Sequence, residues 1–146
     1  MKAKNLKLIA KTVEDLRVVS AHLQDSIANV SDIANLKKNK ILLLQLNRFM
    51  WEDVEKGVFR ESKRIRCAIK FEEVVKVESK NINQKNKNKP LECLAIKSSI
   101  AEGELHKIKI FFAGDSIITI IVEVINVFLQ DLGKSWKVKH IPKHKI

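Results

Sequence analysis

Hydrophobic and polar residues alternate over much of the chain, which is the pattern of β-strands that bury one face. The clearest run is RIRCAIKF (residues 64–71), in which every second residue is apolar and is expected to face the core. A polar run at 37–40 separates two apolar runs and predicts a hairpin whose second strand is 41–49. The segment 91–123 predicts three further strands, with a glycine in each turn between them.

Two other segments have the spacing of amphipathic helices. Between residues 13 and 23 the apolar side chains fall on one helical stripe, and Thr12 with Asp15 matches a capping box that starts a helix. Between 124 and 132 the apolar residues again recur at helical spacing, and Gly133 suits the end of such a helix. The pattern therefore predicts one helix near each end of the chain.

These elements together predict an α+β fold, with an antiparallel sheet of about six strands and an N-terminal and a C-terminal helix. We expect the sheet to be curved or to form a partial barrel, an outline similar in element order to a pleckstrin-homology-like domain. A single domain is expected over 1–146, with a flexible Asn/Lys-rich loop at 80–90 and an irregular tail at 134–146.

Composition narrows the class of protein. The chain has 146 residues, which is enough for one sizeable core. No apolar run approaches the roughly 18 residues of a membrane-spanning helix, and the N-terminus lacks the pattern of a signal peptide. We therefore expect a cytoplasmic protein with no membrane partner. Cys67 and Cys93 lie in apolar strand patterns, so we expect two buried free thiols.

The formal net charge of +11 makes a nucleic acid a candidate partner, because a basic surface attracts the phosphate backbone. Lysine far outnumbers arginine, however, and asparagine and isoleucine are abundant. A preference for AT-rich codons produces this composition without any selected partner. Nucleic-acid binding through a basic surface is therefore the alternative interpretation.

The stretch NRFMWE, residues 47–52, is the best candidate for binding. Tryptophan and arginine are over-represented where protein surfaces bind partners. Arg64 and Arg66 are expected on a neighbouring strand, so Arg48 is expected to join them in an anion-receptive patch. The candidate binding surface is therefore Arg48, Trp51, Arg64 and Arg66. The competing interpretation is that Trp51 closes one end of the core and that the arginines pair with nearby glutamates.

His22 is the candidate for acid–base chemistry. Asp25 lies three positions later, where a carboxylate can orient an imidazole. No Gly-x-Ser-x-Gly elbow accompanies the pair, and the nearby Ser20 falls on the buried stripe of the helix. The stretch is therefore interpreted as a helix terminus, and no catalytic residue is assigned.

Cofactor and metal motifs are missing from the sequence. His140 and His144 have the spacing of two metal ligands on a helix, but Pro142 lies between them and no cysteine is near. The whole chain has four glycines, too few to favour a glycine-rich phosphate-binding loop. We predict neither a metal site nor a cofactor.

Four segments resemble an uncharacterised bacterial family, found chiefly in alphaproteobacteria and known as a domain of unknown function. They are DLRVVSAHLQD (15–25), LNRFMWE (46–52), FAG (112–114) and DLGKSWKVKHIPKH (131–144). The resemblance covers essentially the whole chain and implies a bacterial cytoplasmic setting, with no activity or ligand attached. The long Asn/Lys loop looks like an addition over shorter members, which implies that function lies elsewhere.

Three functions follow from these observations. The leading expectation is a non-enzymatic binding or protein-interaction domain whose partner is unknown. Nucleic-acid binding is the second, and a small hydrolase or lyase centred on His22 is the third. The sequence leaves the oligomeric state open.

Overall fold

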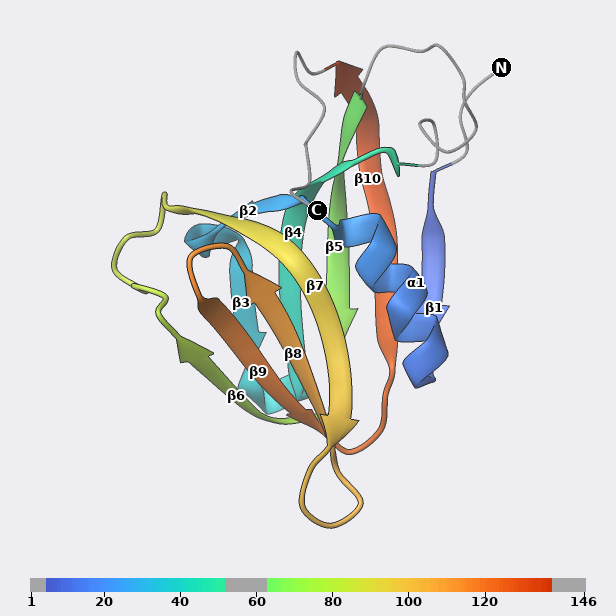
Figure 1. Ribbon diagram of the computed structural model, residues 1–146, viewed down its shortest axis with the longest axis vertical. Helices are drawn as coiled ribbons and strands as arrows, with labels where there is room; N and C mark the ends of the chain where they lie inside the picture. The colour runs from blue at the N-terminus through green and yellow to red at the C-terminus, as the bar shows by residue number, and fades with distance from the viewer. Residues whose placement is uncertain (1–4, 52–62, 138–146) are drawn as a thin grey trace.

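The computed structural model describes residues 5–51 and 63–137. In this part of the chain ten strands form one antiparallel sheet, accompanied by one α-helix (Figure 1). The expected α+β fold with about six strands and two helices is therefore wrong, since 58% of the structure is strand. The strands are β1 (Lys7–Ala10), β2 (Ile27–Asn29), β3 (Ile33–Leu36), β4 (Ile41–Phe49), β5 (Lys63–Phe71), β6 (Val74–Lys80), β7 (Pro90–Ile100), β8 (His106–Phe112), β9 (Ser116–Val122) and β10 (Val127–Lys137). The helices are α1 (Val13–Leu23) and two short 3-10 helices, η1 (Val30–Asp32) and η2 (Lys37–Asn39).

One half of the sheet, which we call half A, contains β1, β10, β5, β4 and β3 in that order. It brings distant parts of the sequence together, because β1 pairs with β10 and places Lys7 opposite Gln130. β5 lies between β10 and β4, and its inward side chains alternate as the sequence predicts, with Cys67 and Phe71 fully buried.

The other half, half B, contains β7, β8, β9 and β6. The short strand β2 links the halves, because Ile27 pairs with Asn47 of β4 and with Glu92 of β7. The inward side chains of both halves form one hydrophobic cluster. β2 leaves no recognisable pattern in the sequence, because three residues are too few to show a period.

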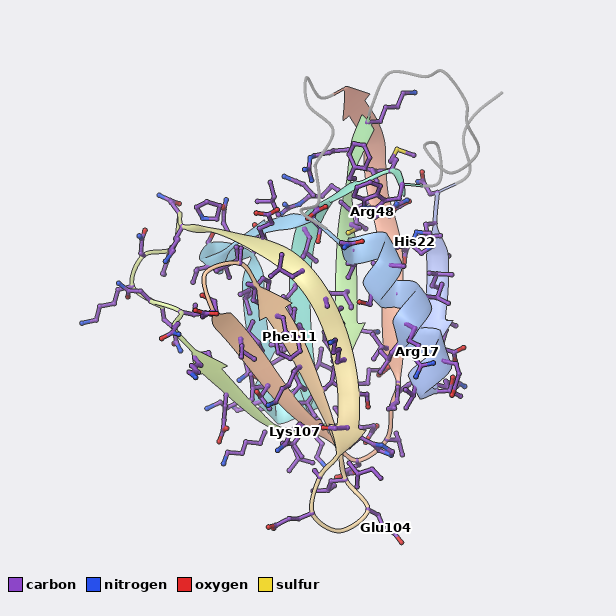
Figure 2. All side chains as sticks on the ribbon, viewed as in Figure 1. Arg17, His22, Arg48, Glu104, Lys107 and Phe111 are labelled. Carbon is purple, nitrogen blue, oxygen red and sulfur yellow. The ribbon has the colours of Figure 1, made fainter. Side chains whose placement is uncertain are left out.

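α1 packs against β7 on one side and β1 on the other (Figure 1). Its buried stripe consists of Leu16, Val19 and Leu23. The predicted capping box of Thr12 and Asp15 is confirmed, with each side chain accepting a backbone N–H of the other. Arg17 and His22 project from this helix (Figure 2).

The predicted C-terminal helix is instead β10. Its helical spacing is coincidental, because the same residues also alternate: Val127 and Leu129 are buried, while Phe128 and Gln130 lie on the outer face. Pairing with β1 and β5 on both edges decides between the two periods. Gly133 does have a left-handed φ of 75°, but it lies where the register of β10 shifts against β5 and ends no helix.

The predicted hairpin and the two predicted free thiols are confirmed. β3 and β4 form the expected hairpin, and Lys40 takes a left-handed φ of 56° in its turn. Cys67 and Cys93 are buried free thiols. Residues 81–89 connect β6 to β7. The flexibility expected for this loop stays a prediction. The irregular tail was expected from residue 134, but β10 continues to residue 137, and residues 138–146 lie outside the described residues.

Candidate functional site

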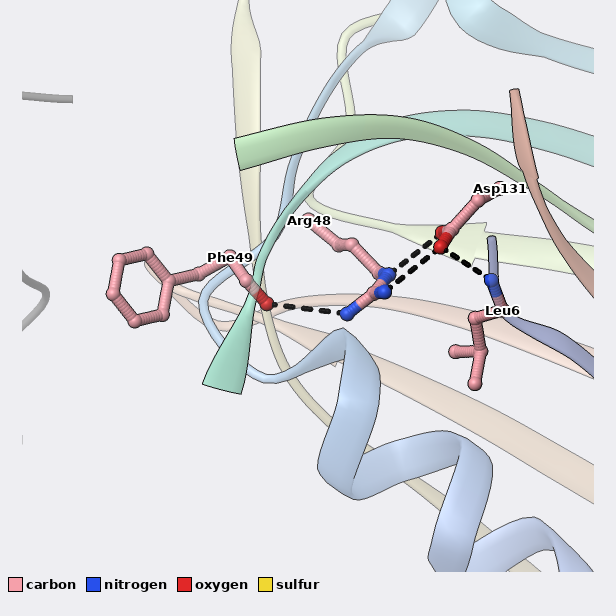
Figure 3. Close-up of polar contacts among 4 residues, drawn as sticks. All are labelled: Leu6, Arg48, Phe49 and Asp131. Carbon is pink, nitrogen blue, oxygen red and sulfur yellow. Dashed lines mark hydrogen bonds and ion pairs between the residues drawn. The ribbon is translucent and has the colours of Figure 1, made fainter. Parts of the chain in front are cut away.

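Arg48 of the predicted binding surface is buried against Asp131 (Figure 3). Its Nε donates to Asp131 Oδ1 at 2.7 Å and its Nη2 donates to Oδ2 at 2.9 Å. Only 1% of either side chain is exposed. Asp131 Oδ2 also accepts the backbone N–H of Leu6 at 2.8 Å. This corrects the expectation that Arg48 joins Arg64 and Arg66 in a surface patch, because it shares the inward face of β4.

Trp51 lies beyond the end of β4 and is half-buried. Its indole Nε1 donates to the carbonyl oxygen of Gln24 at 2.9 Å. Its ring meets Phe49 edge-on, with 4.6 Å between the ring centroids. Phe49 is thereby fully buried although it has the outward parity of its strand. The indole therefore ties the end of β4 to the end of α1.

Arg64 and Arg66 do lie together on the outer face of β5, as predicted. Arg64 Nη1 donates to the carbonyl oxygens of Asp25 and Asn47, each at 3.1 Å, and burial lowers the pKa of its guanidinium. Arg66 pairs with Asp32 at 2.7 Å and also donates to the side chain of Asn47. Both guanidinium groups thus make bonds within the molecule. Capture of a protein partner by Trp51, Arg64 and Arg66 stays a prediction.

The hydroxyl groups near His22 are engaged with the backbone. Ser20 Oγ accepts the N–H of Ile96 at 2.9 Å, and Ser26 Oγ donates to the carbonyl oxygen of Leu23 at 2.6 Å. A serine nucleophile needs a hydroxyl directed at its base. These contacts favour the interpretation of this stretch as a helix terminus.

Within residues 5–51 and 63–137, no group of three or more His, Cys, Asp or Glu side chains is placed to hold a metal ion. His140 and His144 lie outside this part. Burial raises the pKa of Cys67 and of Cys93 to about 12, so neither thiol is a ready nucleophile. None of the described helices has the length and apolar character to cross a membrane.

A groove of about 590 Å³ opens between the edges of β3 and β6. In the described sheet β3 pairs with β4 alone and β6 pairs with β9 alone, so each has one edge without a strand partner. Chain direction makes these edges antiparallel, because η2 leads from β3 into β4 beside the start of β6. We call this space the β3–β6 groove.

Backbone hydrogen bonds close the groove at both ends. At one end the N–H of Val74 donates to the carbonyl oxygen of Lys40 at 2.9 Å. At the other end the N–H of Ser31 donates to the carbonyl oxygen of Lys87 at 3.0 Å. The two edges are therefore joined near both ends of the groove and stay apart between them.

The groove has an apolar floor and a polar rim. Leu42 and Ile118 are buried at its base. Half-buried aliphatic side chains stand above them, and none of the lining residues is acidic. The aliphatic residues are Val30, Ile33, Val77 and Ile82, and the polar residues are Ser31, Asn35, Lys37, Ser79, Gln84 and Lys87.

The β3–β6 groove has no signature in any single stretch of the sequence. Its walls come from segments that are distant in sequence and meet only once both halves of the sheet have formed. One local signal was available: Ile82 is an isolated aliphatic residue in the otherwise polar Asn/Lys-rich segment, and it packs against the core.

The fold and the groove define the class of protein: a strand-rich antiparallel domain with one described helix and a lined groove between two strand edges. The chain belongs to the family described as protein of unknown function (DUF2948), whose model matches residues 6–144. The resemblance to an uncharacterised family is thereby confirmed. No curated protein and no solved structure matches the chain.

Proposed function

We propose that the protein is a non-enzymatic binding domain and that its ligand occupies the β3–β6 groove. The observation that supports this most directly is the combination of volume and lining. At about 590 Å³ the groove falls within the range of roughly 300–1,000 Å³ that is usual for ligand sites. Ligand sites also combine an apolar wall with a few polar groups, as this groove does.

The lining indicates an unbranched aliphatic chain that carries an anionic end group. The floor offers aliphatic contacts such as Ile33 and Val77, and burial of each methylene contributes about 0.8 kcal/mol. Lys37 and Lys87 provide positive charge near opposite ends of the groove, and no carboxylate is among the lining residues. A carboxylate or phosphate at the end of the chain would complement one of these two lysines, and reversing both charges removes both possibilities.

An added peptide strand fits this groove less well. β6 carries Lys76, Glu78 and Lys80, and charged residues on an edge strand oppose pairing with another chain. The register of β6 against β9 also shifts between Val74 and Lys76. β3, with four residues, offers a short edge.

Titration with cis-parinaric acid, a fluorescent long-chain fatty acid, tests the proposal. The wild-type protein should bind the probe with a stoichiometry of one, and palmitate should displace it. Lys37→Glu/Lys87→Glu should weaken binding by about tenfold or more, because attraction at the rim becomes repulsion. Hexadecanol has the same aliphatic chain without the charge, so its affinity should differ little between wild type and this double variant.

The matched control is Lys38→Glu/Lys85→Glu, which makes the same charge change at exposed lysines next to the groove residues in sequence. It should leave probe affinity within about threefold of wild type. Absence of probe binding by the folded wild-type protein would overturn the function. Equal weakening by both double variants would show that the probe responds to overall charge and would overturn the assignment of the groove.

A protein partner and a cytoplasmic location remain predictions about the same chain. Acid–base catalysis centred on His22 is not proposed, because the hydroxyl groups of Ser20 and Ser26 serve the backbone.

A further inference from the structure

The outer face of half B carries a cluster of lysines around one aromatic ring. None of these residues lines the β3–β6 groove. Lys107, Lys109 and Phe111 follow one another at every second position of β8, so all three lie on the same face. Lys97 of β7 lies directly opposite Lys109. We call these four residues the lysine face, and Figure 2 shows Lys107 and Phe111 on β8.

We propose that the lysine face binds the backbone and bases of a single-stranded nucleic acid. The first observation is the pairing of Lys97 with Lys109. Like charges directly opposite each other on neighbouring strands destabilise a sheet. Local rules of this kind are broken chiefly where function needs it. An anionic backbone across these strands would remove the repulsion.

The second observation is that Lys97, Lys107 and Lys109 take part in no ion pair of the described residues. Glu78 lies in the same cross-strand row, beyond Thr119. It pairs with Lys76 at 2.8 Å, which lowers the pKa of its carboxyl, and the positive charge of Lys107 also helps to lower that pKa. The three lysines outnumber this one nearby carboxylate, so the lysine face keeps a net positive charge for a ligand.

The third observation is the aromatic ring among the charges. Phe111 is half-buried on the outer face, and the ammonium nitrogen of Lys97 lies 5.9 Å from its ring centroid. Proteins that bind single-stranded nucleic acids combine a positively charged track with aromatic side chains, because every base can stack on an aromatic ring. A duplex could place its phosphates at the lysines, but its bases are already stacked on one another and could not stack on Phe111.

A depression of about 380 Å³ adjoins this face between α1 and β7. Arg17 and Ser20 of α1 line it, together with Lys97 and Ser98 of β7. The guanidinium of Arg17, the ammonium of Lys97 and the hydroxyl of Ser98 are groups that contact phosphate oxygens, while Ser20 Oγ already accepts the N–H of Ile96. The depression therefore extends the cationic track from β8 across β7 to α1.

Binding of a fluorescein-labelled single-stranded oligouridylate, measured by anisotropy at two or more salt concentrations, tests this inference. Lys97→Gln/Lys107→Gln/Lys109→Gln should weaken binding by about tenfold or more and reduce the slope of log K against log salt by about 2. Phe111→Ala should weaken binding about fivefold or more at unchanged salt slope, because it removes stacking and no charge.

The matched control is Lys38→Gln/Lys85→Gln/Lys89→Gln, which removes three positive charges from exposed positions away from the lysine face. It should change affinity by no more than about threefold. Thermal unfolding of each variant shows whether the fold is kept. If Phe111→Ala does not fold, Phe111→Leu supplies the same loss of stacking with more of the packing.

Three results would overturn the inference. One is the absence of oligonucleotide binding at low salt. Another is equal weakening by the two triple variants, which would assign the attraction to diffuse charge. The third is loss of binding to phosphatidylglycerol vesicles, but not to the oligonucleotide, in the triple variant of the lysine face, which would assign the face to a membrane surface. Because the groove variants change other residues, failure here leaves the fatty-acid test unaffected.

Discussion

At the scale of single residues, Arg48 and Asp131 show what a buried charge does in this fold. The guanidinium and the carboxylate form two parallel hydrogen bonds at 2.7 and 2.9 Å, and the backbone N–H of Leu6 binds the carboxylate as well. The pair joins β4 to β10 across β5 and anchors the start of β1. Both charges are out of water, so the pair is stable only as long as both partners are present.

Replacing one partner should therefore cost more than replacing both. Arg48→Met leaves the carboxylate buried without its cation and should lower the free energy of unfolding by about 3–5 kcal/mol. Arg48→Met/Asp131→Leu should lower it less than Arg48→Met alone. Urea denaturation of the wild type, both single variants and the double variant measures the coupling. Additive effects of the single changes would show that the pair does not act as a unit.

At the scale of single elements, the stability of the N-terminal end of α1 depends on pH. The N–H groups of Lys11 and Thr12 donate to the Asp15 carboxylate, and these bonds lower its pKa below the ordinary 3.8. A carboxylate with a depressed pKa in the folded state stabilises that state above its unfolded pKa. This contribution is lost as the pH falls through the lowered value.

Asp15→Asn should therefore melt at a lower temperature than wild type near neutral pH. The difference should shrink as the pH falls below 3.8, because the wild-type carboxylate is then protonated too. Thr12→Ala, which removes the other half of the capping box, should cost about 1 kcal/mol near neutral pH and less at low pH, because the Thr12 side chain helps to lower the pKa of Asp15. Thermal melts monitored by circular dichroism provide the comparison. A constant difference between wild type and Asp15→Asn at all pH values would contradict this account.

The elements that the sequence predicts correctly are those with local signals. The capping box of α1, the β3–β4 hairpin and the alternation of β5 are each contained in a few neighbouring residues. β10 was mistaken for a helix because its apolar residues satisfy both periods, and only its partners on both edges select the strand. Arg48 falls in the series of alternate residues of β4 that face inward, so its burial had a local signal. Its partner Asp131 did not, because it lies 83 positions away.

The β3–β6 groove and the lysine face were beyond sequence analysis for a similar reason. Lys107, Lys109 and Phe111 show their common face in the sequence of β8, but their juxtaposition to Lys97 needs the register of β7. Predicting the groove would require the course of the whole sheet, since the groove exists only where the unpaired edges of β3 and β6 approach each other.

At the scale of the whole molecule, the two buried thiols report whether the halves of the sheet unfold together. Cys67 belongs to β5 of half A and Cys93 to β7 of half B, and both lie in the one hydrophobic cluster. Burial raises the pKa of each to about 12, which adds to their protection because the thiolate is the reactive form.

Both cysteines should therefore react with iodoacetamide slowly and at the same rate under native conditions. Mass spectrometry of peptides after timed labelling measures the two rates separately. Thiol labelling in urea, where both are exposed, gives the reference rate. Faster labelling of Cys93 than of Cys67 would show that half B opens on its own.

The pairing of β1 with β10 has a consequence for synthesis on the ribosome. Residues 7–10 emerge long before their partners at 127–130, so this edge of half A cannot form until almost the whole described chain has been translated. Until then Arg48 lacks Asp131 and must remain solvated, which keeps its end of β4 open to water. A nascent chain of this protein should thus stay sensitive to proteases and dependent on chaperones until β10 leaves the exit tunnel.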